Sequence, residues 1–212
     1  MTIKNIIFIF VFISAFGLLF YNLSRILSYV KLGLPENRFD NPLERIKNVL
    51  KIAFGQSKLL REPIAGAIHF LIFWGFMLFL FAVIEAITQG FYSGFSLSFL
   101  GPLFSAITFV QDIFGLLVII AVLWALYRRF IQKVKRLDLG EGNFDAALIL
   151  FMILIVVLSM FGQNIAHVAN NNFILKEYEV RPISAALSTI IFSGSNSSQL
   201  VFEICWWIHI IT

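Results

Sequence analysis

Long apolar runs constrain this chain more than any other feature of its sequence. Four of them cover residues 5–23, 65–89, 103–127 and 146–166, and a fifth begins near residue 200 and reaches the last residue, Thr212. A helix needs about 20 apolar residues to cross the hydrocarbon core of a bilayer, which is about 30 Å thick. Of the 212 residues, 59% are hydrophobic and only 13% are charged. The sequence therefore predicts an all-α membrane protein, an antiparallel helical bundle of four complete transmembrane helices plus the start of a fifth.

The fifth run is only about half a span long. A half-span leaves backbone N–H and C=O groups unsatisfied in lipid, so we expect the chain to be a fragment of a longer protein. Its single cysteine, Cys205, lies in this run. One cysteine allows neither a disulfide within the chain nor an iron–sulfur cluster held by four thiolates, and Cys205 fits the role of a small apolar helix residue.

The basic residues are unevenly distributed between the loops. Eight of them lie at 24–64 and five follow the third run at 128–136, whereas the loop 90–102 has none and the loop 169–199 has only Lys176 and Arg181. Lys and Arg are retained on the cytoplasmic side of a membrane. This bias predicts a multi-pass protein of the cytoplasmic (inner) membrane, with the N-terminus outside and the fifth helix heading inward.

Two loop segments have patterns of their own. In the cytoplasmic segment 34–60, Pro42 can start a helix, and six apolar residues follow at three- and four-residue spacing: Leu43, Ile46, Val49, Leu50, Ala53 and Phe54. With its basic face, this pattern predicts an amphipathic helix at the lipid interface. In the outer loop 169–199, Ile183–Phe192 is apolar but too short to cross, which predicts a re-entrant or interfacial segment. Topology and lipid headgroups account for the basic charge, so no nucleic-acid partner is expected.

Three histidines lie near the predicted membrane faces. His69 is in the second span, within the stretch GAIHFLIFWGF, His167 is at the outer end of the fourth, and His209 is in the fifth. An imidazole in hydrocarbon must find a hydrogen-bond partner or bind something, and neutral imidazole is a common axial ligand of haem iron. The inner-face His69 cannot meet the outer-face His209, so its partner is expected beyond the end of this chain. A pair of His167 and His209 is compatible with the topology.

Three acidic residues lie near the outer ends of their spans. Glu85, Asp112 and Glu203 are at similar predicted depth, beside the two outer histidines, Gln163 and Asn164. Carboxylates are costly in hydrocarbon and often serve a proton or ligand path. They predict a polar pocket that handles quinone protons. The alternative is that each is an interfacial side chain with no joint role.

Aromatic residues and glycines allow two interpretations as well. Trp74, Trp206 and Trp207 are candidates for stacking on a porphyrin or quinone ring, although paired tryptophans near an interface also serve as membrane anchors. Gly66 and Gly75 leave room either for a flat ligand or for a closely packed helix.

The order of several motifs resembles the haem b membrane domain of the respiratory nitrate reductase gamma-subunit type. It is most similar to the version fused to a cytosolic iron–sulfur domain in membrane oxidoreductases with electron-transfer-flavoprotein or heterodisulfide-type partners. The matching stretches are PENRFDNPLER (35–45), REPIAGAIHFLIFWGF (61–76), LGP (100–102), QD (111–112), ALYRR (125–129) and WWIH (206–209). They span nearly the whole chain.

The resemblance implies that His69 is an axial ligand of an inner haem b and His209 of an outer one. It also implies a site for a quinone, menaquinone or ubiquinone, and iron–sulfur clusters in a downstream region or a partner. The sequence departs from the pattern at Phe79, where the second ligand of the outer haem would be a histidine. The count is thus one haem, or two if His167 substitutes.

Three classes of function are compatible with these features. The first is a membrane electron-transfer subunit that passes electrons between a cytosolic iron–sulfur or flavoprotein partner and the quinone pool through haem b. The second is a haem-free membrane anchor or small transporter, in which the histidines and carboxylates form a proton or substrate path. A scaffold without a ligand is a third possibility.

Overall fold

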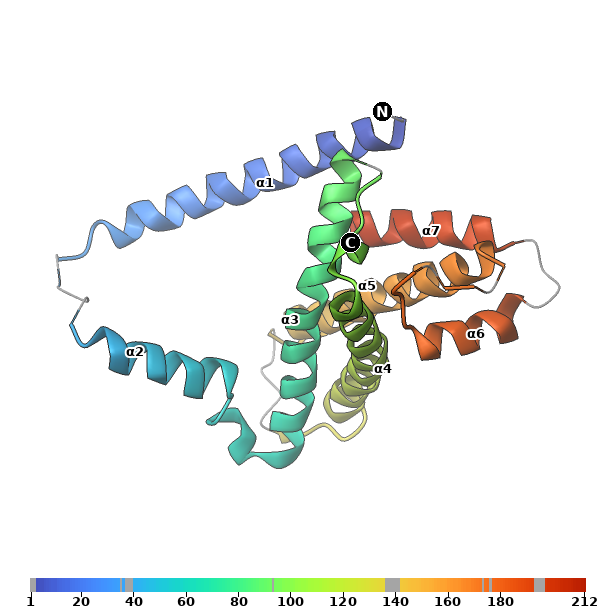
Figure 1. Cartoon of the computed structure of the whole chain (residues 1–212). Helices are drawn as coiled ribbons and strands as arrows, with labels where there is room; N and C mark the ends of the chain where they lie inside the picture. The colour runs from blue at the N-terminus through green and yellow to red at the C-terminus, as the bar shows by residue number, and fades with distance from the viewer. Residues whose placement is uncertain are drawn as a thin grey trace. The chain divides into compact units, whose positions relative to one another are not determined.

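A computed structural model describes residues 3–34, 36, 40–92, 94–135, 142–172, 174–175, 177–192 and 197–212. Every regular element in these ranges is helical (Figure 1). In chain order they are α1 (Ile3–Val30), α2 (Pro42–Asn48), a π-helical stretch η1 (Val49–Phe54), a 3-10 turn η2 (Leu59–Arg61), α3 (Pro63–Phe91), a second 3-10 turn η3 (Leu97–Leu100), α4 (Pro102–Phe130), α5 (Gly142–Asn170), α6 (Pro182–Phe192) and α7 (Ser198–Ile211). The predicted all-α class is confirmed for this part of the chain.

Among the described residues, four helices are long and apolar enough to cross a membrane: α1, α3, α4 and the Phe144–Asn170 part of α5. With 29 residues each, α3 and α4 are about 43 Å long. Each helix thus extends beyond its apolar run. The four predicted spans are confirmed in length and composition, whereas the bundle arrangement and the outside N-terminus stay predictions. Four of the described helices, α2, α3, α4 and α6, begin with proline, whose missing N–H costs nothing at the first helical position.

The chain divides into two compact units, which are described separately. The first contains Met1–Ser57 and Ala82–Ser96. Its long-range contacts join the start of α1 to the end of α3, where Asn5 Nδ2 donates a 2.8 Å hydrogen bond to the Gly90 carbonyl. The ring of Phe8 packs on Gly90 and meets Phe91 edge to face. Because Gly90 has no side chain, the Phe8 ring can approach its backbone.

The second unit contains Lys58–Phe81 and Leu97–Thr212. Its core is a cluster of buried side chains from α4, α5 and α6, with Phe79 of α3 and Phe202 of α7 packed against it. The members of the cluster are Val118, Val122, Val157, Phe161, Ile165, Ala166 and Phe192. Of the four long helices, α4 is the most buried. Helix α5 packs against three other helices of this unit, α4, α6 and α7.

Glycines mark several contacts between helices of the second unit. A Cβ added at Gly75 of α3 would collide with Val118 of α4, and one at Gly115 of α4 would collide with Phe161 of α5. In the same way, Gly162 of α5 receives the thiol of Cys205 in α7. Small residues let membrane helices approach closely. Of the two uses expected for Gly75, helix packing is the one observed.

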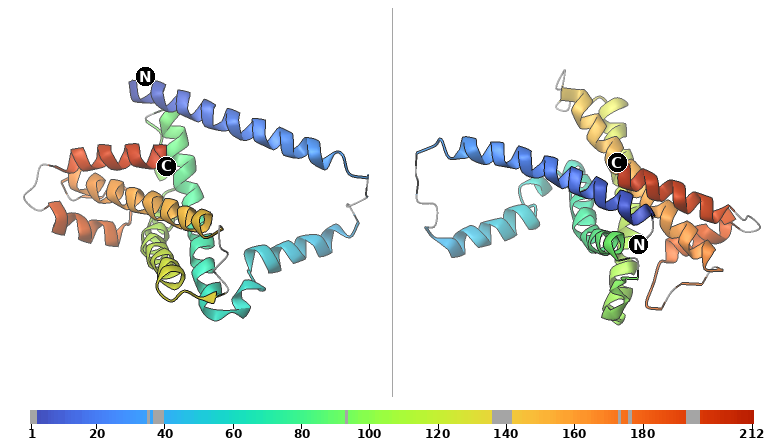
Figure 2. Two further views of the ribbon diagram at one scale, coloured as in Figure 1. Left: turned by 180° about the vertical axis from the view of Figure 1, so that it is seen from behind. Right: turned by 90° about the horizontal axis from the view of Figure 1, so that it is seen from above.

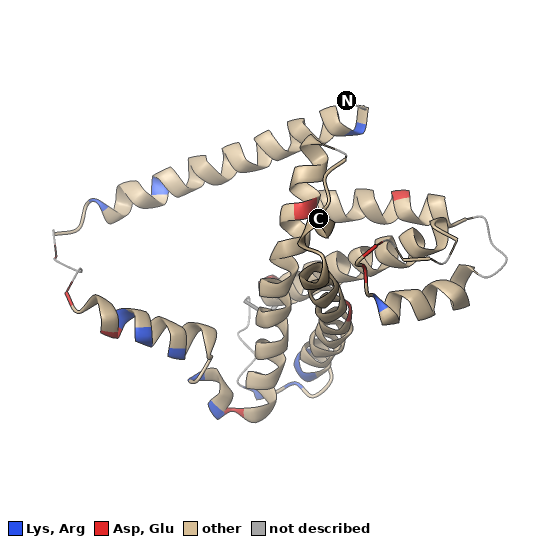
Figure 3. Ribbon diagram, in the orientation of Figure 1, with Lys and Arg blue, Asp and Glu red and all other residues tan. Residues whose placement is uncertain are grey.

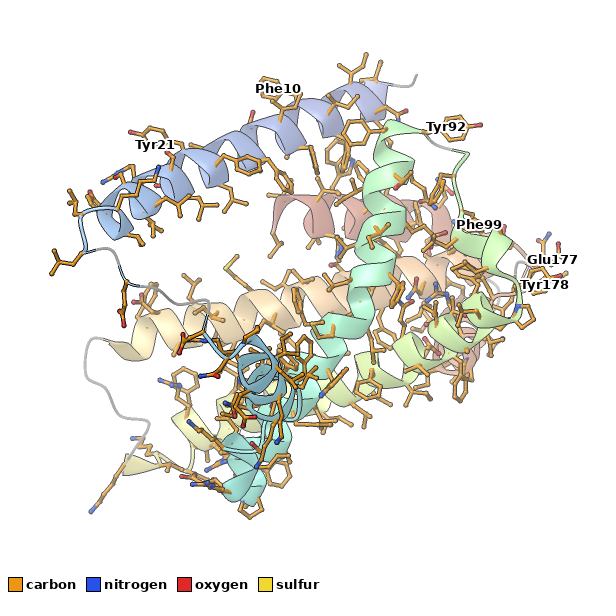
Figure 4. The ribbon with its side chains drawn as sticks, turned by 60° about the vertical axis from the view of Figure 1, so that its left-hand side comes forward. Phe10, Tyr21, Tyr92, Phe99, Glu177 and Tyr178 are labelled. Atoms are coloured by element: carbon orange, nitrogen blue, oxygen red, sulfur yellow. The ribbon has the colours of Figure 1, made fainter. Side chains whose placement is uncertain are left out.

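Most apolar side chains of the long helices point outward. Phe10 and Tyr21 of α1 project away from the ribbon, as do Tyr92 and Phe99 in the connection between α3 and α4 (Figure 4). All four are well exposed in the isolated chain. A soluble domain rarely exposes so much apolar surface, whereas helices that face lipid do.

The predicted amphipathic segment 34–60 is helical in its middle. The helix begins at Pro42 and runs through α2 into η1. The residue before it, Asn41, has a left-handed backbone conformation with a φ of 49°. Its apolar side chains, including Leu43 and Leu50, are exposed, and basic residues recur along it (Figure 3). The location at the lipid interface stays a prediction. Residues 35 and 37–39 of this segment and 193–196 of the outer loop lie outside the described residues, as do Arg136 and Lys176.

Candidate functional site

The carboxylate of Asp112 is buried in α4 and binds the start of α6. Its Oδ2 accepts hydrogen bonds from the backbone N–H groups of Ile183 at 2.6 Å and Ser184 at 3.2 Å. Its Oδ1 accepts a 2.5 Å hydrogen bond from the Ser184 hydroxyl. These N–H groups belong to the first turn of α6, which has no partners for them within the helix, and a negative charge there is also favourable to the helix dipole. Asp112 therefore caps α6 from another helix.

Two further residues on the same face of α4 extend this attachment. Ser105 Oγ donates to the Tyr178 carbonyl at 3.1 Å, and Thr108 Oγ1 accepts from the Val180 N–H at 3.0 Å. Positions 105, 108 and 112 share one helix face because they are three and four residues apart. The three side chains thus fix the path of residues 178–184. The predicted re-entrant or interfacial segment Ile183–Phe192 corresponds to α6, which is held on α4 at its N-terminal end.

Helix α7 lies beside α5 and runs antiparallel to it (Figures 1 and 2). Near its start, Asn170 of α5 donates to Gln199 Oε1 at 3.1 Å. Near its end, His209 Nδ1 lies 2.9 Å from Ser159 Oγ and 3.1 Å from the Val156 carbonyl oxygen. The imidazole of His209 is therefore anchored on the backbone and on one buried hydroxyl of α5.

The structure does not bring His167 to His209. Ser159, which contacts His209, lies eight residues before His167 on α5, a distance of about 12 Å along the helix. His167 Nε2 instead lies 3.1 Å from Asn171 Nδ2 and 3.8 Å from Glu179 Oε2. Glu179 Oε1 in turn lies 4.0 Å from Arg181 Nε. The pair of His167 and His209, which the sequence allowed, is thus not formed in the structure.

His69 lies on an exposed part of α3, and its ring stacks on Phe73 with 6.4 Å between centroids and 15° between planes. Phe73 meets Trp74 edge to face. One turn before His69, Gly66 is buried against the backbone of Leu59. The absence of a side chain at Gly66 therefore lets the backbone of Leu59 lie against α3. His69 is on the exposed face of α3 in the isolated chain.

The other two acidic candidates have separate partners. Glu85 Oε1 accepts a 3.0 Å hydrogen bond from Ser96 Oγ within the first unit. In the second unit, Glu203 Oε1 accepts from Gln199 Nε2 at 3.3 Å, one turn earlier on α7. Together with the binding of Asp112 to α6, these contacts give each carboxylate a local role. Among the described residues, no cluster of three or more His, Cys, Asp and Glu is arranged to hold a metal ion.

The tryptophans of α7 lie beside an apolar groove. Trp206 and Trp207 meet edge to face with 4.9 Å between centroids. Trp207 lines an open groove of about 660 Å³ between α7 and α5, whose other lining residues are Ile155, Ile204, Ile208, Ile211 and Thr212. The lining carries no charged side chain, so the groove suits an apolar molecule or chain.

Sequence reasoning missed several residues that the structure shows to be central. Ser105 and Thr108 could have been found from the polar face that they form with Asp112 on an otherwise apolar helix. Glu179, between His167 and Arg181, had no such signal, because its loop position says nothing about its neighbours. Ser159 is a single hydroxyl in an apolar run, and only its contact with α7 distinguishes it.

Comparison with known proteins adds two relatives. The chain is 35% identical over 210 residues, 97% of its length, to a Bacillus subtilis (strain 168) protein named probable iron-sulfur-binding oxidoreductase FadF. It is 27% identical over 190 residues, 82% of its length, to the EtfAB:quinone oxidoreductase of Syntrophomonas wolfei subsp. wolfei. The matches cover 28% and 25% of these two proteins, so the chain spans about a quarter of the length of the curated relatives it matches. No family model and no solved structure matches.

Both relatives are named as oxidoreductases, one as iron–sulfur-binding and one as quinone-linked. Neither name refers to haem or to a nitrate reductase gamma subunit.

Proposed function

We propose that this chain is the membrane electron-transfer part of a quinone-linked oxidoreductase of the cytoplasmic membrane. It passes electrons between a cytosolic iron–sulfur or electron-transfer-flavoprotein partner and the quinone pool. The observation that carries the proposal is the match over nearly the whole chain to an iron–sulfur-binding oxidoreductase, in a segment with four span-length apolar helices, two of which contain a histidine. The relatives' remaining length leaves room for the iron–sulfur domain that the family resemblance implies.

Haem b is the cofactor that we propose for electron passage, and the imidazoles of His69 and His209 are the side chains that would hold it. His209 is anchored through Nδ1, which leaves Nε2 as its ligand atom, and His69 stands on the exposed face of α3. When bound, haem supplies one-electron redox chemistry. The chain's own part is to hold the imidazoles at fixed depth and to surround them with apolar helices. Phe79 packs against the core cluster and supplies no ligand.

A quinone is the proposed membrane substrate, and the groove between α5 and α7 fits its apolar chain, with Trp207 beside it. Reduction of a quinone consumes protons, and we assign their transfer to Glu85 and Glu203. Both oxygens of Asp112 accept hydrogen bonds from α6, so we propose a positioning role for this residue in place of proton handling. Glu203 and Trp207 are both on α7, one turn apart.

The test is a reduced-minus-oxidised visible spectrum of the full-length protein that contains this chain, purified in detergent. The wild type should show b-type haem bands. His69→Ala and His209→Ala should each lose haem absorbance while the protein still inserts, whereas His167→Ala should retain it. Full haem content in the His69→Ala variant would contradict that assignment. A colourless wild type would favour the haem-free anchor or transporter.

A further inference from the structure

His209 Nδ1 is part of a three-atom contact on α5. It lies 2.9 Å from Ser159 Oγ and 3.1 Å from the Val156 carbonyl oxygen, while the Ser159 hydroxyl itself donates to the same carbonyl at 2.9 Å. Ser159 is only 4% exposed. A buried serine in a helix commonly bonds the carbonyl three residues earlier, as this one does. What is unusual here is the imidazole nitrogen that shares the contact.

Counting hydrogens assigns the tautomer of His209. A carbonyl oxygen only accepts hydrogen bonds, so its 3.1 Å approach to Nδ1 is favourable only if Nδ1 carries the proton. A bare Nδ1 would place its lone pair against the lone pairs of that oxygen. With the proton on Nδ1, the ring N–H has two acceptors, Ser159 Oγ and the Val156 carbonyl oxygen. The serine hydroxyl donates to the same carbonyl, so every hydrogen in the contact is used. In the neutral imidazole the other nitrogen, Nε2, then holds the free lone pair.

We propose that Ser159 and the Val156 carbonyl form a positioning site that fixes His209 in the Nδ1–H tautomer and presents Nε2 as its ligand atom. The ligand role rests on the proposed haem function, whereas the tautomer does not. Histidines that ligate a metal usually donate their other N–H to a carbonyl or a carboxylate, which fixes the ring and raises its basicity as a ligand. Ser159 is therefore a positioning residue, and the backbone of α5 sets the ring angle together with it.

The structure supplies a matched control for Ser159. Ser188 of α6 is also a buried helix serine, fully enclosed, and its hydroxyl donates to the carbonyl of Ala185 three residues earlier at 2.8 Å. No described contact joins Ser188 to an imidazole. Replacing either serine by alanine removes the same hydroxyl and the same local hydrogen bond. Only the Ser159 change removes a partner of His209.

The experiment is ¹⁵N NMR of histidine-labelled full-length protein in lipid nanodiscs, in the reduced state. The His209 signal is assigned by its loss in His209→Gln. We expect a protonated Nδ1 in the wild type and in Ser159→Thr, which keeps the hydroxyl. In Ser159→Ala we expect a shifted Nδ1 resonance with weaker hydrogen bonding, and no change in Ser188→Ala. An Nε2–H resonance for wild-type His209 would overturn the inference, whether or not haem is bound.

A second measurement separates this inference from the proposed function. In redox titration, Ser159→Ala should move the haem midpoint potential to a more positive value, because a less basic imidazole stabilises ferric iron less. Ser188→Ala should leave the potential unchanged. Equal potentials for Ser159→Ala and the wild type would overturn the positioning role. Absence of haem from the wild type would instead overturn the proposed function, while the NMR experiment would still report the tautomer.

Discussion

Replacing Asp112 by alanine should release the start of α6 without disturbing the long helices. The change removes the acceptor of two backbone N–H groups, those of Ile183 and Ser184, while the Ser184 hydroxyl can rotate to another acceptor. A buried donor left unsatisfied costs about 1–3 kcal/mol. At about 1.5 kcal/mol each, the two groups lower the free energy of opening α6 by about 3 kcal/mol. Every 1.4 kcal/mol is a factor of ten, so the amides of α6 should exchange roughly 100-fold faster.

Hydrogen exchange read by mass spectrometry over residues 182–192 measures this effect, with peptides from α4 and α5 as internal references. Asp112→Asn should give a smaller increase, because one amide oxygen still accepts a hydrogen bond. Asp145→Ala, an exposed acid in the first turn of α5, is the matched control and should leave α6 unchanged. If Asp112→Ala left exchange in α6 at the wild-type rate but abolished quinone reduction, Asp112 would be a site residue and the capping account would be wrong.

Two further predictions test the packing and the membrane position. Gly115→Ala should lower the unfolding temperature, because its Cβ would collide with Phe161 and overpacking costs about 1–3 kcal/mol. The control Gly17→Ala in α1 has open space around its Cβ and should be nearly neutral. Equal effects of the two changes on the unfolding temperature would contradict the packing role of Gly115. A nitroxide attached at Leu50→Cys in a Cys205→Ala background should be accessible to oxygen and shielded from a water-soluble relaxant; the reverse pattern would place η1 in water.

The long helices were predictable because their constraint is local. About 20 apolar residues in a row allow few folds, and the prolines at 63 and 102 mark where two of the helices begin. The helices are longer than the apolar runs, since hydrogen bonding within a helix continues past the last apolar residue. The all-α class and the four spans therefore followed from the sequence alone.

The contacts of the candidate residues were not predictable in the same way. Asp112 was identified as a costly buried charge, but its partners lie more than 70 residues further along the chain and depend on how the outer loop packs. His209 was identified as well, yet its contacts are with a serine and a backbone carbonyl, and not with the histidine that the topology allowed. Sequence patterns locate polar groups within a span, whereas tertiary packing decides which groups they meet.

The central claim is that electrons pass through this chain to a quinone. The most direct test is to reduce the purified full-length protein with dithionite, remove excess reductant, add a soluble menaquinone or ubiquinone analogue without oxygen, and follow the visible spectrum. The account predicts that b-type haem bands present in the reduced protein disappear as the quinone is reduced, and more slowly in Glu203→Gln. Haem bands that persist in the presence of quinone, or a reduced protein without such bands, would contradict it.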